Sequence, residues 1–184
     1  MHVALFGGSF NPPHVGHQLA ALYVLETAPV DALWFVPCFQ HAFEKALAPF
    51  EQRVNMCEAL AAALGLRVRV ETIEGTLGGA SRTLLTVKAL QAAYPQNRFS
   101  LVIGSDLRAE RQTWYGADEL MGLVDFLIVG RAGVDPDAGV VMPAVSSTDV
   151  RSRLAAGLPV DAYVPKSVLE LIVANRLYQS FLQT

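Results

Sequence analysis

Short apolar runs alternate along the chain with longer segments in which apolar residues recur at helical spacing. The short runs are bounded by glycine, proline or polar residues, which is typical of strands buried in a core. Strands are predicted over residues 2–6, 33–36, 67–71, 99–103 and 125–129, with a last short one at 140–142. Helices are predicted over residues 15–27, 50–64, 81 or 83 to about 94, a short segment ending at 120–123, 150–156 and 168–178.

Alternating strands and helices, with mostly continuous apolar strands, are typical of a parallel sheet covered on both faces. The sequence contains no internal repeat and no interdomain linker. It therefore predicts one α/β domain over residues 1–184, a Rossmann-like doubly wound parallel sheet that includes the C-terminal helices from about residue 147. Ligands bind such sheets outside the carboxyl ends of the strands. Three predicted strand ends carry glycine: Gly7-Gly8, Gly104 and Gly130.

The composition narrows the function classes. Apolar residues make up 52% of the 184 residues, enough for a substantial core, and the net charge of −3 argues against a protein that coats nucleic acid. No apolar run is long enough to span a membrane, and the N-terminus lacks the basic stretch of a signal peptide. Cys38 and Cys57 cannot form a disulfide framework, so a reducing cytoplasm is the expected compartment. The sequence does not decide between a monomer and a homo-oligomer.

The string GGSFNPPHVGH, residues 7–17, carries the first candidate chemistry. Its glycines allow a ligand close to the backbone, and exposed amides at the start of the next helix favour phosphate. His14 and His17 lie one helical turn apart and can both donate to phosphate oxygens. The alternatives are a tight turn with capping histidines, or a zinc site for which no third ligand is evident. No protein-bound metal is expected.

Two later segments add candidates. In VSSTDVR, residues 145–151, the hydroxyl residues are good helix N-caps and Arg151 adds a forked positive charge, although an ordinary capped helix explains them equally. In IGSDL, residues 103–107, Asp106 follows a strand end and can accept from ribose hydroxyls or cap a helix. Trp114 and Tyr115 can form one wall of a heterocycle site or belong to the core.

These strings resemble those of a known family. GGSFNPPHVGH resembles the GxFxPxHxGH signature of the HxGH nucleotidyltransferases, and SSTDVR is similar to their SSTxxR motif. Together with SRTLLTVKALQAAYP, FSLVIGSD, TWY and DAYVPKSVLELIVANRLY, they resemble, in order and spacing, bacterial nicotinate mononucleotide adenylyltransferases over almost the whole chain. That family joins ATP and nicotinate mononucleotide into nicotinate adenine dinucleotide and releases pyrophosphate.

The resemblance implies roles for particular residues. His14, His17 and Arg151 are expected to act on the phosphates of ATP, with His17 nearest the α-phosphate. The rest of the expected ATP site is Gly7, Gly8, Ser9, Phe10, Gly104, Asp106, Ser146, Ser147 and Thr148. In the family a tryptophan stacks on the pyridine ring and a threonine holds its carboxylate, positions that Trp114 and Thr83 match. Mg²⁺ is expected to arrive on the ATP phosphates.

The acceptor half departs from the family pattern. Ser81-Arg82-Thr83 stands where the family has SYT, and the loop that contains Lys45 lacks the usual PPHK. Arg82 favours an anionic acceptor or is a solvated residue at a helix start. Lys45 reaches the acceptor phosphate or is a surface lysine.

Two alternative functions stay open. One is a sister nucleotidyltransferase with another phosphorylated acceptor, such as phosphopantetheine. The other is a nucleotide-sensing module without catalysis, against which the intact histidines and Arg151 argue.

Overall fold

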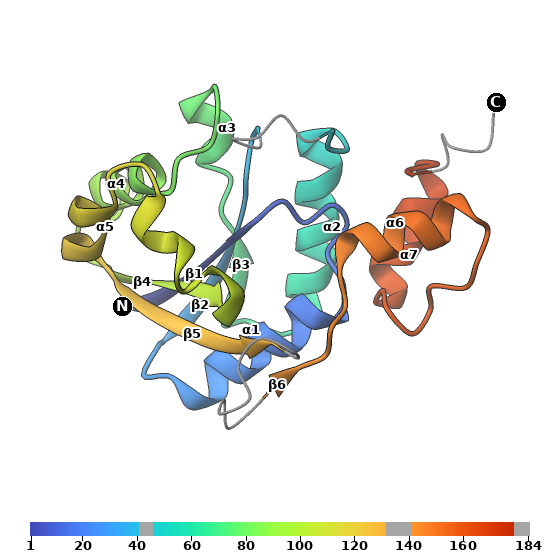
Figure 1. The fold of residues 1–184 in the computed structure, drawn as a ribbon, viewed down its shortest axis with the longest axis horizontal. Coiled ribbons are helices and arrows are strands. Elements are labelled where there is room, and N and C mark those ends of the chain that lie inside the picture. Colours follow the sequence, from blue (N-terminus) through green and yellow to red (C-terminus); the bar gives the residue numbers. More distant parts are fainter. Residues whose placement is uncertain (41–45, 132–140, 179–184) are drawn as a thin grey trace.

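Six parallel strands form one sheet in the order β3-β2-β1-β4-β5-β6 (Figure 1). The computed structural model describes residues 1–40, 46–131 and 141–178. The strands are β1 (His2–Gly8), β2 (Ala32–Pro37), β3 (Val68–Val70), β4 (Arg98–Gly104), β5 (Asp125–Arg131) and β6 (Val141–Met142). The chain moves outward from β1 in one direction, then returns to β1's other side to add β4. This reversal confirms the predicted doubly wound fold and creates a switch point between β1 and β4.

Helices cover both faces of the sheet (Figure 1). The α-helices are α1 (Val15–Thr27), α2 (Phe50–Ala62), α3 (Glu74–Leu77), α4 (Thr83–Ala93), α5 (Ala117–Leu123), α6 (Ser147–Ala155) and α7 (Lys166–Ala174). Two 3₁₀ turns, η1 (Ser105–Leu107) and η2 (Glu110–Thr113), lie between β4 and α5. No helix in the described ranges is long and apolar enough to cross a bilayer.

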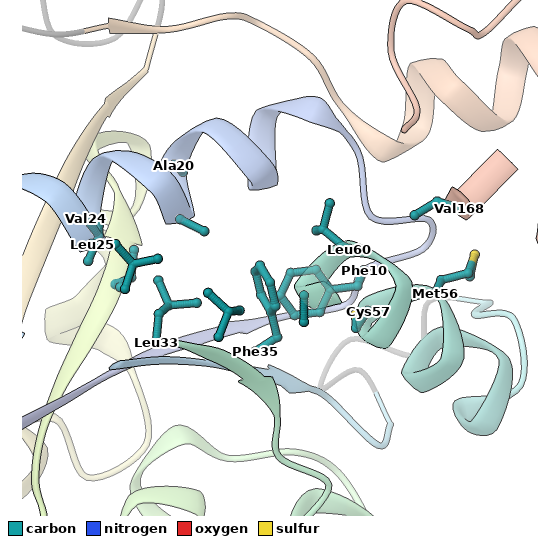
Figure 2. Close-up of a cluster of buried hydrophobic side chains, with 14 of the residues drawn as sticks. Phe10, Ala20, Val24, Leu25, Leu33, Phe35, Met56, Cys57, Leu60 and Val168 are labelled. Atoms are coloured by element: carbon teal, nitrogen blue, oxygen red, sulfur yellow. The ribbon is translucent and has the colours of Figure 1, made fainter. Parts of the chain in front are cut away.

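One face of the sheet packs against α1, α2 and the C-terminal helices. Figure 2 shows Phe10 and Phe35 at its centre, with Leu60 of α2 beside them. Val168 of α7 belongs to the same buried cluster, so the segment after residue 147 shares its core with the strands. Because side chains alternate along a strand, Leu33 and Phe35 of β2 point to this face.

The opposite face packs against α4 and α5. Its core contains Trp34 of β2, Leu90 of α4 and Leu120 of α5. The Arg69 guanidinium lies over the Trp34 ring, 3.6 Å from its centroid. Both strand faces are therefore buried, which explains the continuous apolar strands in the sequence.

Some elements differ from those predicted. The structure contains the short helix α3 before Gly78 and Gly79 turn the chain at positive φ, and α6 and α7 begin three and two residues earlier than predicted. The 3₁₀ turns η1 and η2 were not predicted, since turns of three and four residues leave no periodicity. Helix α7 ends at Ala174, four residues early, because Arg176 and Tyr178 adopt left-handed φ of 51° and 65°.

Candidate active site

A cavity of about 580 Å³ opens at the carboxyl ends of the strands. Gly7 and Gly8 of β1, Gly104 of β4 and Gly130 of β5 all line it. The cavity therefore lies at the switch point between β1 and β4, where ligands of doubly wound sheets bind. All three predicted strand ends that carry glycine meet there.

His14 and His17 line this cavity side by side. His14 is the N-cap of α1, and its backbone N–H donates to Nδ1 of His17 over 3.2 Å. The two imidazole rings lie 3.8 Å apart at their centroids, tilted by 31°. Because Nδ1 of His17 accepts a hydrogen bond, the neutral ring carries its proton on Nε2. His17 is thus set up as an Nε2–H donor.

Gly16 makes room for the histidine pair. A Cβ at this position would lie 3.0 Å from Cε1 and Nδ1 of His14, closer than nearly all real Cβ contacts. The glycine of the HVGH string is therefore required by the His14 ring rather than by a special backbone angle.

Phe10 belongs to the predicted ATP site. Its ring is buried in the core, 4.9 Å from the His17 ring at the centroids and 5.4 Å from Phe35 (Figure 2). It is not among the described residues that line the cavity. Its side chain packs against the His17 ring, and its part in the ATP site stays a prediction.

Asp106 faces the cavity from η1 together with Gly104. A Cβ at Gly104 would overlap Oδ1 of Asp106, so the glycine leaves space for the carboxylate to fold back over the strand end. The buried Ser105 between them tightens this turn. The arrangement presents a carboxylate to the cavity, and its binding of ribose hydroxyls stays a prediction.

The second motif contacts the first directly. Ser147 Oγ donates to the Pro12 carbonyl over 2.9 Å, and Arg151 Nη1 donates to the Asn11 carbonyl over 2.7 Å. These two hydrogen bonds join residues that are 135 and 140 positions apart in the sequence. Figure 1 shows the chain entering α6 beside the segment that leads into α1.

The hydroxyl groups of the second motif already have protein partners. Ser146 caps α6 by accepting from the Asp149 N–H over 3.1 Å, and Thr148 Oγ1 accepts from Arg151 Nη2 over 3.3 Å. None of Ser146, Ser147, Thr148 and Arg151 is among the described cavity-lining residues. Their part in phosphate binding stays a prediction, while the contacts of Ser147 and Arg151 with residues 11–12 are a feature of the fold.

The predicted acceptor residues form a separate wall of the same cavity. Arg82, Thr83, Trp114 and Tyr115 all line it. The Arg82 guanidinium lies 5.8 Å from the centroid of the Tyr115 ring, and Arg82 is the one arginine or lysine among the described lining residues. Trp114 also packs against the second core, and its role as one wall of a heterocycle site stays a prediction. Lys45 lies outside the described residues.

Sequence reasoning missed Arg53 of α2, whose side chain is 1% exposed. It donates to four carbonyls: Ala48, Ser9, Cys38 and Phe39, over 2.7–3.1 Å. These contacts tie the loop after β1 to the loop after β2. The signal was present, because Arg53 shares a helix face with Cys57 and Leu60, where an apolar residue is expected.

Glu74 was also missed. Its buried carboxylate lines the cavity and accepts from the hydroxyls of Ser81 and Thr86. The Phe39 N–H donates to Ser81 Oγ over 3.0 Å, so this cluster joins the start of α4 to the loop after β2.

The cavity also contains a thiol, that of Cys38. Burial raises the pKa of Cys38, and the nearby positive charge of Arg53 offsets this only in part. The thiol is therefore protonated at neutral pH and is a poor nucleophile there.

Comparison with known proteins agrees with this geometry. Residues 5–153 match the cytidylyltransferase-like family model. A probable nicotinate-nucleotide adenylyltransferase of Anaeromyxobacter dehalogenans is 45% identical over 96% of both chains, and the nicotinate-nucleotide adenylyltransferase of Bacillus subtilis is 34% identical over 97% of this chain and 98% of its own.

Solved structures share the fold. The nicotinic acid mononucleotide adenylyltransferase of Plasmodium falciparum, complexed with NaAD, superposes with a TM-score of 0.83 at 20% identity, covering 99% of both chains. With sequence identity well above 30% over nearly its full length, the chain belongs to the nicotinate-nucleotide adenylyltransferases, within the cytidylyltransferase-like family.

Proposed function

We propose that this protein transfers AMP from ATP to nicotinate mononucleotide, giving nicotinate adenine dinucleotide and pyrophosphate. The observation that carries the proposal is one cavity lined by residues expected to bind both substrates. The histidine pair lies at the start of α1 and Thr83 at the start of α4, helices on opposite faces of the sheet, and Asp106 and Trp114 line the same cavity. The names of the relatives support the same reaction.

The reaction needs no nucleophile from the protein. The acceptor's 5′-phosphate is largely a dianion at neutral pH, because the second pKa of a phosphate monoester is about 6. One of its oxygens attacks the α-phosphorus of ATP, the bond from that phosphorus to the bridging oxygen breaks, and pyrophosphate leaves with the electron pair. Catalysis then consists of positioning the two phosphates in line and stabilising negative charge.

His17 is the residue we assign to the α-phosphate. Because the His14 N–H donates to Nδ1 of His17, the neutral ring carries its proton on Nε2. A hydrogen bond from this Nε2–H to the α-phosphate strengthens as negative charge develops on the transferring group. His14 supports it from the stacked position. The backbone of Gly7, Gly8 and Ser9 adjoins the same phosphates, and Asp106 beside Gly104 accepts from the ribose.

The second motif serves the departing phosphates in this proposal. Ser147 and Arg151 contact the loop that precedes His14, and Ser146 and Thr148 are their neighbours in the same motif. The Arg151 guanidinium has five N–H groups, so beside its bonds to the Asn11 carbonyl and to Thr148 Oγ1 it can also donate to the β- or γ-phosphate.

The acceptor binds against the wall that contains Thr83 and Trp114. Trp114 stacks on the pyridine ring, and the Thr83 hydroxyl holds its carboxylate. Arg82 adds positive charge to a lining that also contains the carboxylates of Glu74 and Glu110. Lys45 is kept as a candidate for the acceptor phosphate.

Mg²⁺ would enter with ATP in this proposal, since Mg²⁺ commonly binds through substrate phosphates with few protein ligands. In the described ranges no group of three or more His, Cys, Asp or Glu side chains is placed to hold a metal ion. The cytoplasm is the proposed compartment. Both cysteines are free thiols.

A pyrophosphate-release assay with ATP and a panel of acceptors tests the function. The panel contains nicotinate mononucleotide, nicotinamide mononucleotide, phosphopantetheine and small phospho-alcohols, and the first is expected to react fastest. If phosphopantetheine reacts while both pyridine nucleotides are inert, the acceptor assignment fails and adenylyl transfer survives. If no acceptor releases pyrophosphate, the transfer itself is wrong.

The acceptor wall is tested by two substitutions. Trp114→Ala should raise the acceptor KM several-fold and spare the ATP KM, since aromatic stacking contributes roughly 0.5–1.5 kcal/mol beyond area burial. Thr83→Val keeps the side-chain shape but removes the hydroxyl, so it should lower the preference for nicotinate over nicotinamide mononucleotide. A Trp114 that served only the core would lower Tm and leave both KM values unchanged.

A further inference from the structure

Asn11 is the point where four distant parts of the chain meet. Its side chain is 3% exposed. Its Oδ1 accepts from the Ala48 N–H and from the Tyr178 hydroxyl, each over 2.9 Å, and its Nδ2 donates to the Ala46 carbonyl. Its backbone carbonyl accepts from Arg151. Every one of these partners lies more than 30 residues away in the sequence.

The segment after α7 is shaped to bring Tyr178 to this point. Arg176 and Tyr178 both have φ in the left-handed region, at 51° and 65°. Such angles are unfavourable for a non-glycine residue and persist only where the surroundings determine them. Tyr178 packs against the core cluster of the first face and ends on the Asn11 amide.

The Tyr178 hydroxyl is a donor at any pH near neutral. Burial raises its pKa well above the usual range, although the positive charges of Arg151 and Arg53 work in the opposite direction. It therefore keeps its proton, and Oδ1 of Asn11 keeps both donors.

Only two residues separate Asn11 from the histidine pair, and both are prolines. Pro12 and Pro13 have locked φ angles, and Asn11 and Pro12 are each restricted because a proline follows them. His14 then continues in extended conformation, with φ −146° and ψ 173°. This short stiff segment fixes the position of His14 relative to Asn11. The hydrogen bond from the His14 N–H to Nδ1 then orients the His17 ring.

We propose that Tyr178 is a positioning residue for the reaction: by donating to Asn11 it sets the stiff segment that orients His14 and His17 in the cavity. This inference rests on the proposed function, because its kinetic test measures the rate of adenylyl transfer. The segment after α7 thus takes part in shaping the active site, although Tyr178 itself contacts no substrate.

The kinetic test is Tyr178→Phe, which keeps the ring and removes the hydroxyl. At a temperature where both proteins are folded, kcat is expected to fall roughly 3- to 10-fold, with both KM values within about twofold, because small misplacements of catalytic groups are costly in rate. The matched control is Tyr163→Phe, a hydroxyl deletion in a tyrosine that borders the same core and is expected to leave kcat unchanged. An unchanged kcat in Tyr178→Phe overturns the proposal.

A double substitution tests the route through Asn11. In an Asn11→Ala background, Tyr178→Phe should add no further loss of kcat, since residues that act through one contact are not additive. An equal loss in both backgrounds means that Tyr178 acts otherwise, and the proposal is then wrong.

A spectroscopic test is independent of turnover. In protein with ¹⁵N-labelled histidine, the ring resonances of His14 and His17 should shift in Tyr178→Phe and stay in place in Tyr163→Phe. Unshifted resonances overturn the positioning role even if Asn11→Ala does not fold. If the unmodified protein transfers no adenylyl group, the proposed function fails, and this comparison still decides the role of Tyr178.

Discussion

Single atoms decide the chemistry at the histidine pair. The Nδ1 atom of His17 accepts from a backbone N–H, which leaves Nε2–H as the donor, and the absence of a Cβ at Gly16 gives the His14 ring its place. The sequence predicted both histidines from their spacing. It could not predict the tautomer or the reason for the glycine, because both depend on how the two rings stack.

Replacing His17 tests the assignment to the α-phosphate. His17→Ala should lower kcat by roughly 10²–10³-fold, the range seen when one donor to developing charge is removed, with a modest change in the ATP KM. His2→Gln is a suitable control, because His2 lies at the start of β1 and bonds to the Pro29 carbonyl and to Ser100. Normal turnover by His17→Ala would show that the phosphate assignment is wrong.

Replacing Gly16 separates helix stability from catalysis. Alanine within a helix normally stabilises by about 0.5–1 kcal/mol relative to glycine, so Gly16→Ala should not lower Tm by much. The new Cβ must still push the His14 ring by a few tenths of an ångström, and kcat should fall roughly 3- to 10-fold. Gly122→Ala in α5 is the control, since a Cβ there meets no atom within 4 Å. Equal kcat in both variants would contradict the steric argument.

At the scale of elements, the order of strands and helices followed from the sequence because each element carries its own periodicity. Helix α1 occupies the predicted residues 15–27, and the motif residues stand at the predicted strand ends. Arg53 stands out on an apolar helix face, but the partners of Arg53 and Glu74 could not be predicted, because the carbonyls and hydroxyls that they bind come from other segments. The packing of the Phe10 ring in the core could not be predicted either, because a motif position does not say which way a side chain points.

The start of α6 yields a prediction about Arg151. Its two terminal nitrogens contact the Asn11 carbonyl and Thr148, and a lysine can keep the charge but not the fork. Arg151→Lys should raise the ATP KM several-fold and leave the acceptor KM nearly unchanged. The KM values of both substrates are measured beside Tm. Equal damage to both substrates would indicate a misfolded helix instead of a lost phosphate contact.

On the scale of the whole molecule, one sheet separates two cores that share only the strands. Leu60 of α2 is fully buried on one side and Leu90 of α4 on the other. Each truncation to Ala should cost about 2–5 kcal/mol of unfolding free energy. Because the sites share no side-chain neighbours, the costs should add within roughly 0.5 kcal/mol in the double variant. Denaturant unfolding measures all three, and strong non-additivity would show that the cores are coupled through the sheet.

The bracing of residues 9–13 has a consequence for the order of events during folding. Arg53, Ser147, Arg151 and Tyr178 reach this loop from sites between about a quarter and nearly the full length of the chain. Contacts of such high sequence separation form late, since the loop-closure entropy is paid before they bring any gain. A partly synthesised or partly refolded chain can therefore build its first strands and still hold its histidines unaligned. We therefore expect catalytic turnover to appear only after α6, α7 and Tyr178 have packed against this loop.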